Sequence, residues 1–342
     1  MKIIKKISIV FSLILSFISC DDTYSPPSEI EKKVYTLNLD LNNFPESLPI
    51  DIENLRYCLW GSKKGDNKQI LLKSFIFLKG DSGIINTADH FTITQKELIE
   101  EDIDITVTVE EKLGNEASEP SNWIVCKSSG NLSSSSISLS FKEGLFKSEN
   151  ESFMNSKVSF FLNAPSTGSV GGNHNGVWFI NDLSATTGGF ENFPVLGENW
   201  EYGAWISLDD NTPADNTVYV PIGKFTNTSQ ADTSIFGASF NNEFKGANSV
   251  YPFVGEDFIE DPNGKFSNLD FPLDLRKPST VFNKSPNVII TIRPKSYDNT
   301  THPFFIWVYS KQIGINESLS EKIIMDNRNQ GVNFSGKLSL IP

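Results

Sequence analysis

Cys20 is the residue whose setting most clearly specifies a chemistry. Three lysines among the first six residues precede an apolar run, residues 7–18, and Ser19 separates that run from Cys20. Two aspartates follow directly. A basic start, a short apolar stretch and a small residue at the cut are typical of a secretory signal peptide. As a helix the run would rise only about 18 Å, whereas a bilayer core is about 30 Å thick. The sequence therefore predicts cleavage beside Cys20 rather than a membrane span.

The residues around Cys20 resemble the bacterial lipobox, in which the signal is cut just before the cysteine and the thiol carries a diacylglycerol. The alternative is a buried apolar helix that ends in cysteine, but the order of charges, apolar run and small residue favours the lipobox. The resemblance implies a signal peptide over residues 1–19, lipid attachment at Cys20 and the membrane as a partner. It places the protein on the extracytoplasmic side, at the outer membrane or the cell surface. Two or three acyl chains anchor a protein stably, whereas one binds marginally. Residues 20–33 have the composition of an exposed tether.

Two further cysteines, Cys58 and Cys126, lie in strand-like segments of the same predicted domain. An extracytoplasmic compartment permits a disulfide between them. A disulfide needs Cα atoms about 4.4–6.8 Å apart, which the sequence does not establish. Two separate buried thiols are the favoured interpretation, and the disulfide remains the alternative.

Composition limits the classes of function. About 322 residues remain after the predicted cleavage, which suits two domains better than one core. The hydrophobic content of 38%, with 26 phenylalanines, is typical of folded domains. The formal net charge of -13 and the lack of clustered lysine and arginine argue against a nucleic-acid partner.

Other residues suited to chemistry are sparse. The three histidines, His90, His174 and His302, lack the spacing of metal ligands, and a structural role is expected for each. No nucleophile elbow, phosphate loop or zinc-protease motif occurs. We therefore expect no catalytic residue, no cofactor and no metal site. Acid-rich loops leave calcium and paired glycosidase carboxylates as alternatives, although solvated loop tips are favoured. These acids are Asp209, Asp210, Asp215, Glu256, Asp257, Glu260 and Asp261.

The elements that must position these residues are strands. Apolar and polar residues alternate at 35–41, 103–109, 137–141 and 336–341, and turn-forming residues separate such runs. One short helix is predicted at 94–102, with Thr94 and Glu97 forming a capping box. The fold class predicted is all-β: two tandem antiparallel β-sandwich domains, each with its own core, after a lipoprotein signal peptide. The first domain covers 34–146 and the second 155–342, with an insertion near 232–286.

The two domains show signs of an internal repeat. Tyr57 and Trp60 recur as Tyr202 and Trp205, in each case 145 residues further on. A later strand at 105–109 recurs 183 residues further on. Chance similarity between strands is the alternative. If the repeat is real, both tryptophans are core residues on equivalent interior strands, and an aromatic ligand platform is the less favoured interpretation.

Three segments, 201–206, 221–225 and 289–294, resemble the extracytoplasmic domain of anti-sigma-K factors. That family shows a Tyr-x-x-Trp strand, a Gly-x-Phe strand and a later strand ending in Glu-Pro, and Arg293 stands here in place of the usual glutamate. The resemblance implies a non-enzymatic β-sandwich outside the membrane. It does not imply sigma-factor inhibition, which belongs to a cytoplasmic helical domain.

The function expected is that of a non-enzymatic, membrane-anchored lipoprotein acting as a binding or envelope-interaction module, with an unknown protein or glycan ligand. The alternative is a glycan-binding or glycan-processing lipoprotein. Exposed aromatic rings would stack on sugars in that case, and Trp178, Trp200 and Phe253 are the candidates. A sensor of envelope state is a third possibility, supported only by the family resemblance.

Overall fold

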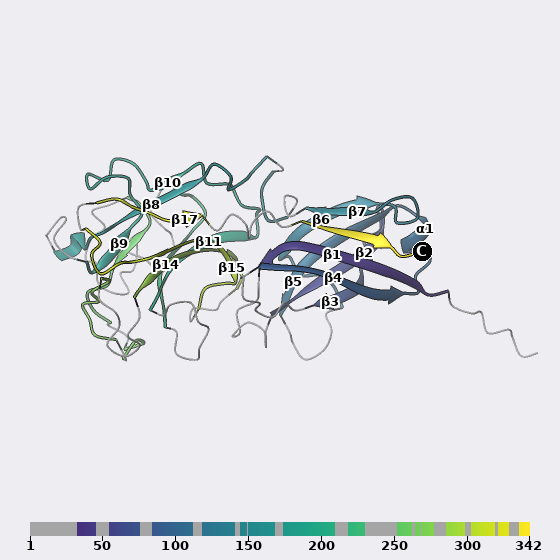
Figure 1. The fold of residues 1–342 in the computed structure, drawn as a ribbon, viewed down its shortest axis with the longest axis horizontal. Helices are drawn as coiled ribbons and strands as arrows, with labels where there is room; N and C mark the ends of the chain where they lie inside the picture. Colours follow the sequence, from purple (N-terminus) through teal and green to yellow (C-terminus); the bar gives the residue numbers. More distant parts are fainter. Residues whose placement is uncertain are drawn as a thin grey trace, which may run out of the picture. The chain divides into compact units, whose positions relative to one another are not determined.

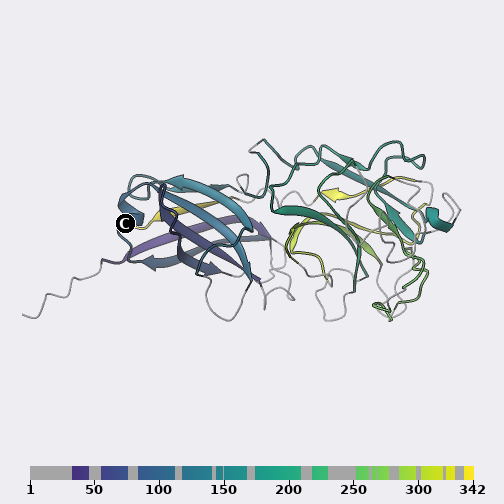
Figure 2. The same ribbon diagram turned by 180° about the vertical axis from the view of Figure 1, so that it is seen from behind.

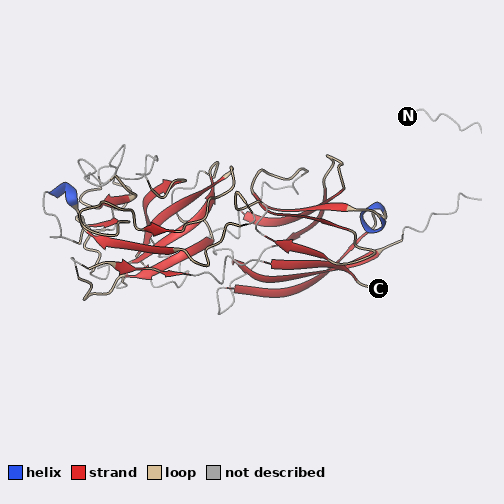
Figure 3. Cartoon of the chain, turned by 90° about the horizontal axis from the view of Figure 1, so that it is seen from above, coloured by secondary structure: helices blue, strands red, loops and turns tan. Residues whose placement is uncertain are grey.

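The computed structural model describes most of the chain beyond residue 32. The described ranges are 33–45, 55–75, 84–111, 118–140, 144–148, 150–167, 174–208, 218–229, 252–261, 264–267, 269–276, 285–297, 302–318, 321–327 and 335–342. Residues 34–342 form one compact unit. Its regular structure is almost entirely antiparallel strand, with very short helices (Figure 3). The predicted all-β fold class is confirmed. Within the described ranges, no helix is long and apolar enough to span a bilayer.

The first half of the unit, residues 34–148, contains the strands predicted from alternation. Its elements are β1 (Tyr35–Pro45), β2 (Leu55–Lys63), β3 (Ile70–Phe75), β4 (Ile84–Ile93), α1 (Glu97–Glu100), β5 (Ile103–Glu111), β6 (Ile124–Gly130) and β7 (Ile137–Ser140). The helix is shorter than expected, and its N-cap is Lys96, without a side-chain capping bond. The predicted capping box is therefore wrong, because Thr94 lies two residues before the N-cap.

The second half, residues 150–342, contains shorter strands around one long sheet. Its elements are β8 (Lys157–Leu162), the 3-10 turn η1 (Pro165–Thr167), β9 (Gly176–Trp178), β10 (Phe190–Glu191), β11 (Trp200–Ser207), β12 (Tyr219–Phe225), β13 (Gly255–Asp257), β14 (Asn287–Pro294), β15 (Ile306–Gln312), β16 (Ile323–Ile324), β17 (Asp326–Asn327) and β18 (Ser335–Leu340).

The C-terminal strand belongs to a sheet of the first half. β18 lies between β1 and β7 in a sheet of order β4-β1-β18-β7, and the yellow strand stands among the purple and blue ones in Figure 1. The alternating segment at 336–341 is thus a strand, as predicted. It does not pair within the second half, to which the sequence assigned it. Alternation specifies a half-buried strand but not its partner.

The other sheet of the first half recurs in the second half. Its order, β3-β2-β5-β6, matches β12-β11-β14-β15, with β17 added at the edge. Figure 2 shows the strands of both halves from behind. The ladder irregularities match as well. Both Trp60 and Trp205 follow a register shift against the neighbouring hairpin strand. Trp60 is 0% exposed and Trp205 is 2% exposed. The prediction of two equivalent, buried tryptophans on interior strands is confirmed.

The sheets of the first half bury their alternating residues together, an arrangement that fits a β-sandwich. Leu37, Leu39 and Leu41 of β1 join a core that also contains Leu59 of β2 and Val107 of β5. Every second residue of a strand faces the same side, so each of these strands supplies a row of apolar side chains.

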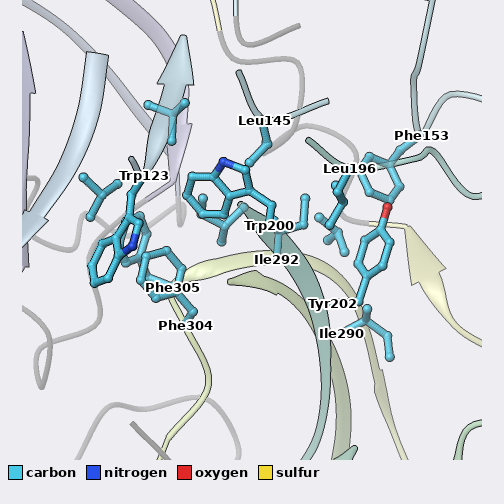
Figure 4. Close-up of a cluster of buried hydrophobic side chains, with 14 of the residues drawn as sticks. Trp123, Leu145, Phe153, Leu196, Trp200, Tyr202, Ile290, Ile292, Phe304 and Phe305 are labelled. Carbon is cyan, nitrogen blue, oxygen red and sulfur yellow. The ribbon is translucent and has the colours of Figure 1, made fainter. Parts of the chain in front are cut away.

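One hydrophobic core runs through both halves, contrary to the expected pair of separate cores. Trp123 of the first half donates its indole N–H to Ser296 Oγ at 2.8 Å and meets Tyr297 edge-on at 5.7 Å between ring centroids. Trp200 donates to the carbonyl of Ile124 at 3.0 Å. Figure 4 shows Trp123 and Trp200 on either side of this junction. Phe153, which lies between the two predicted domains, is also buried in this core.

Candidate functional site

Asp257 is one of two acids, with its neighbour Glu256, that are fully buried in the part of the chain that the structure describes. β13 pairs with β9, which aligns Asp257 with Gly176 and Gly255 with Trp178. A Cβ on Gly255 would lie 2.5 Å from the Trp178 indole, so glycine is required for this close approach. The two glycines allow the strands to bring a carboxylate and an indole N–H together inside the fold.

Asp257 is held by several hydrogen bonds. Its Oδ1 accepts from Trp178 Nε1 at 2.7 Å, and its Oδ2 accepts from the Ser166 backbone N–H at 2.8 Å and from the Ser166 hydroxyl. Burial raises the pKa of Asp257 above its ordinary value, although the bonds from Ser166 and Trp178 oppose that rise. The carboxylate thus fixes η1 against β9 and β13.

The neighbouring Glu256 is also fully buried, and its Oε1 accepts the Asp257 N–H at 3.0 Å. The sequence favoured solvated loop tips for these two acids, and that expectation is wrong. The acids Asp209, Asp210 and Asp215 lie outside the described residues. Asp261 accepts the backbone N–H groups of Lys265 and Phe266 and so orders its own loop. Among the described residues, no group of three or more histidines, cysteines or acids is placed to hold a metal ion.

A second buried charge lies on the repeated sheet. Arg293 of β14 is 0% exposed, and its Nε lies 3.4 Å from Glu201 Oε1 on β11. Its guanidinium donates to the Tyr297 carbonyl and lies 5.7 Å from the centre of that ring. Burial raises the pKa of Glu201, while Arg293 and two nearby lysines act to lower it. The pair joins two central strands next to the junction with the first half.

At the corresponding place in the first half, Glu110 receives hydrogen bonds. Trp60 Nε1 donates to Thr108 Oγ1 at 2.9 Å, and the Thr108 hydroxyl donates to Glu110 Oε1. The backbone N–H of Ser121 donates to the same carboxylate oxygen at 2.8 Å. These bonds connect Trp60, the first tryptophan of the repeat, to the loop that precedes β6.

The cysteines and histidines singled out in the sequence show no arrangement typical of a catalytic or metal site, apart from Cys20, which lies outside the described residues. Cys58 and Cys126 are two buried thiols rather than a disulfide, as favoured. His174 is 8% exposed and His302 is 3% exposed, while His90 lies at the surface. His174 Nδ1 is 4.0 Å from Asp274 Oδ1.

The aromatic residues proposed as a sugar platform are not exposed. Trp178 and Trp200 are each 1% exposed, and both indole N–H groups donate to partners within the fold. Phe253 is half-buried against a small cluster that contains Trp178 and Ile180. The two tryptophans that the glycan alternative would need at the surface are therefore buried. The burial of these tryptophans could not be predicted from the sequence, because the acceptors of their indole N–H groups are distant in the chain.

No family model, curated protein or solved structure matches this chain. The resemblance to the anti-sigma-K extracytoplasmic domain remains a prediction from three short motifs.

Proposed function

We propose that this protein is a non-enzymatic lipoprotein, anchored at Cys20 to the outer side of a membrane, and that its β-rich unit is a binding or envelope-interaction module. The observation that carries the proposal is the order of the first 22 residues: lysines, a short apolar run, Ser19, Cys20 and two aspartates. The lipid supplies the attachment, and residues 20–33 supply the tether.

The way the described fold begins supports an anchored role. β1 starts at Tyr35, directly after the proposed tether, and it is an interior strand. It pairs with β4 on one side and with β18 on the other. A force on the tether would therefore act along a strand whose backbone groups are hydrogen-bonded on both edges. Many ladder bonds would share that load, which suits a protein attached by its N-terminal end.

The buried charged groups support a role that does not depend on catalysis. The carboxylate of Asp257 is occupied by Ser166 and Trp178, and Arg293 is paired with Glu201. Each group therefore connects neighbouring elements of the fold. Glycan binding through Trp178 or Trp200 gains no support, because both rings are enclosed.

Metabolic labelling with a palmitate analogue tests the anchor. We expect label on the parent protein and none on Cys20→Ala. Cys58→Ala is the matched control: it removes a buried thiol but leaves Cys20, so it should label like the parent. Equal labelling of the parent and Cys20→Ala would contradict the proposal.

A further inference from the structure

The C-terminal strand occupies a slot that the strands of the first half leave open. β18 pairs with β1 over six residues, from Leu340 opposite Leu37 to Ser335 opposite Asn42. On its other edge it pairs with β7 over four residues. β1 and β7 are therefore separated by one strand position, and about 195 residues of chain lie between β7 and the strand that fills it.

The second half closes the corresponding place with a strand of its own. β16 follows β15 in the chain as β7 follows β6, and β8 opens the second half as β1 opens the first. β16 pairs directly with β8, with Ile323 opposite Phe160 and Ile324 opposite Ser159. In the first half, one further strand, β18, thus lies between β1 and β7, whereas in the second half no strand lies between β8 and β16.

The slot recognises its strand mainly through the backbone. Leu338 is the one residue of β18 that is fully buried, and Leu340 packs partly against the same core. Gly336 sits close to β1, where a Cβ would lie 2.9 Å from the Asp40 carbonyl oxygen and 3.0 Å from Leu41 Cδ2. Backbone pairing gives affinity to such a strand, and pockets for alternate side chains give selectivity. The slot therefore selects a glycine followed two residues later by a large apolar residue.

We propose that the slot between β1 and β7 is a strand-binding site that accepts β18 from a second copy of this chain as well as from its own. β18 is far from β7 in the chain, and residues 328–334 connect it to β17. An exchanged strand would form the same ladder and bury the same leucine, so the exchange loses no native contact. This inference concerns the fold only and does not depend on the lipid anchor.

A cross-link between copies tests the exchange, because Asp40 and Lys337 are directly opposite in the ladder. Residues opposite each other in antiparallel strands have Cα atoms about 4.5–5.5 Å apart, within reach of a disulfide. An isotopically heavy full chain carrying Asp40→Cys is mixed with a light full chain carrying Lys337→Cys. The two are unfolded together, refolded and oxidised, and linked peptides are identified by mass spectrometry, which separates this link from those of the native cysteines.

We expect a heavy–light link between positions 40 and 337. Its yield should be severalfold above that obtained when the light chain carries Ser335→Cys instead, because Ser335 pairs with Asn42, two residues from Asp40. Adding Leu338→Asp to the Lys337→Cys chain should remove the link, because the buried leucine is lost. The double variant Asp40→Cys/Lys337→Cys should close internally. The proposal is overturned if the double variant closes but the mixture gives no more link than the shifted control. Failure of the double variant to close would overturn the pairing itself.

Discussion

Glu201 and Arg293 face each other across β11 and β14, and the repeat reverses their charges in the first half. There the corresponding pair across β2 and β5 is Arg56 opposite Glu110. In both halves the partner on the later strand is the buried one. The register therefore retains a cross-strand pair of opposite charges even though the two positions have exchanged sign.

The Glu201–Arg293 pair should be important for stability. Glu201→Ala leaves Arg293 buried without its carboxylate, so we expect the free energy of unfolding to fall by about 3 kcal/mol, as for other broken buried pairs. Urea titration measures the loss, and Glu191→Ala on an exposed strand end is the control, with a change of at most about 0.5 kcal/mol.

Exchanging the two charges tests whether the reversed order of the first half is tolerated. The double variant Glu201→Arg/Arg293→Glu should lose less stability than the sum of its single variants, with a coupling of about 0.5–3 kcal/mol. Additive losses in this double-mutant cycle would show that the opposite charges do not interact.

Trp60 and Trp205 should contribute similarly to stability, since they occupy equivalent buried positions in their sheets. Truncating either to alanine should cost about 3–5 kcal/mol. Because one core runs through both halves, we expect each variant to unfold in a single transition rather than to lose one half alone. Circular dichroism and tryptophan fluorescence recorded on the same denaturant series should coincide. Met154→Ala, at an exposed position, serves as the control.

Stability should depend on pH through Asp257. Because burial raises its pKa in the folded state, the folded protein binds this proton more tightly than the unfolded chain does. The protonated form thus favours folding at low pH, and that contribution is lost as pH rises from the ordinary aspartate pKa through the raised one. Asp257→Asn removes the titration but loses acceptor capacity toward Ser166. The stability advantage of the parent over Asp257→Asn should therefore shrink as pH rises through this window in urea titrations. An advantage that grows with pH would contradict the assignment.

Leu338 should hold the C-terminal strand in the first half. Leu338→Ala empties a buried site, with an expected loss of about 2–4 kcal/mol. Amide hydrogen exchange should accelerate in β1 and β7 more than in β11 and β14, because the ladder next to β18 opens locally. Ser339→Ala, on the partly exposed face of the strand, is the matched control and should leave exchange near that of the parent.

Much of the secondary structure could be predicted because alternation reports burial directly. Residues 35–41 and 103–109 became the cores of β1 and β5 for that reason. The repeat was also visible, because Tyr57 and Trp60 are buried residues of β2 that recur with the same spacing in β11. Their counterparts Tyr202 and Trp205 have equivalent ladder partners, which sequence spacing alone implied.

The partners of short or terminal elements could not be predicted. The pattern of β18 is satisfied by any sheet with one buried face, so its insertion beside β1 depends on the vacant position there. Glu256 and Asp257 look like a loop tip in the sequence, because the acceptor role of Asp257 depends on Ser166 and Trp178, distant in the chain. A short helix such as α1 depends on tertiary contacts of Leu98 and Ile99 more than on its caps.

The mass of the N-terminal peptide from membrane-extracted protein tests the proposed function most directly. We expect a mature chain that begins at Cys20 and carries a diacylglycerol on that residue, recovered in the membrane fraction. Cys20→Ala should yield no such peptide, whereas Ser19→Ala should still yield it, since a small residue is kept before the cut. A mature chain that retains residues 1–19, or one that begins at Cys20 without lipid, would contradict it.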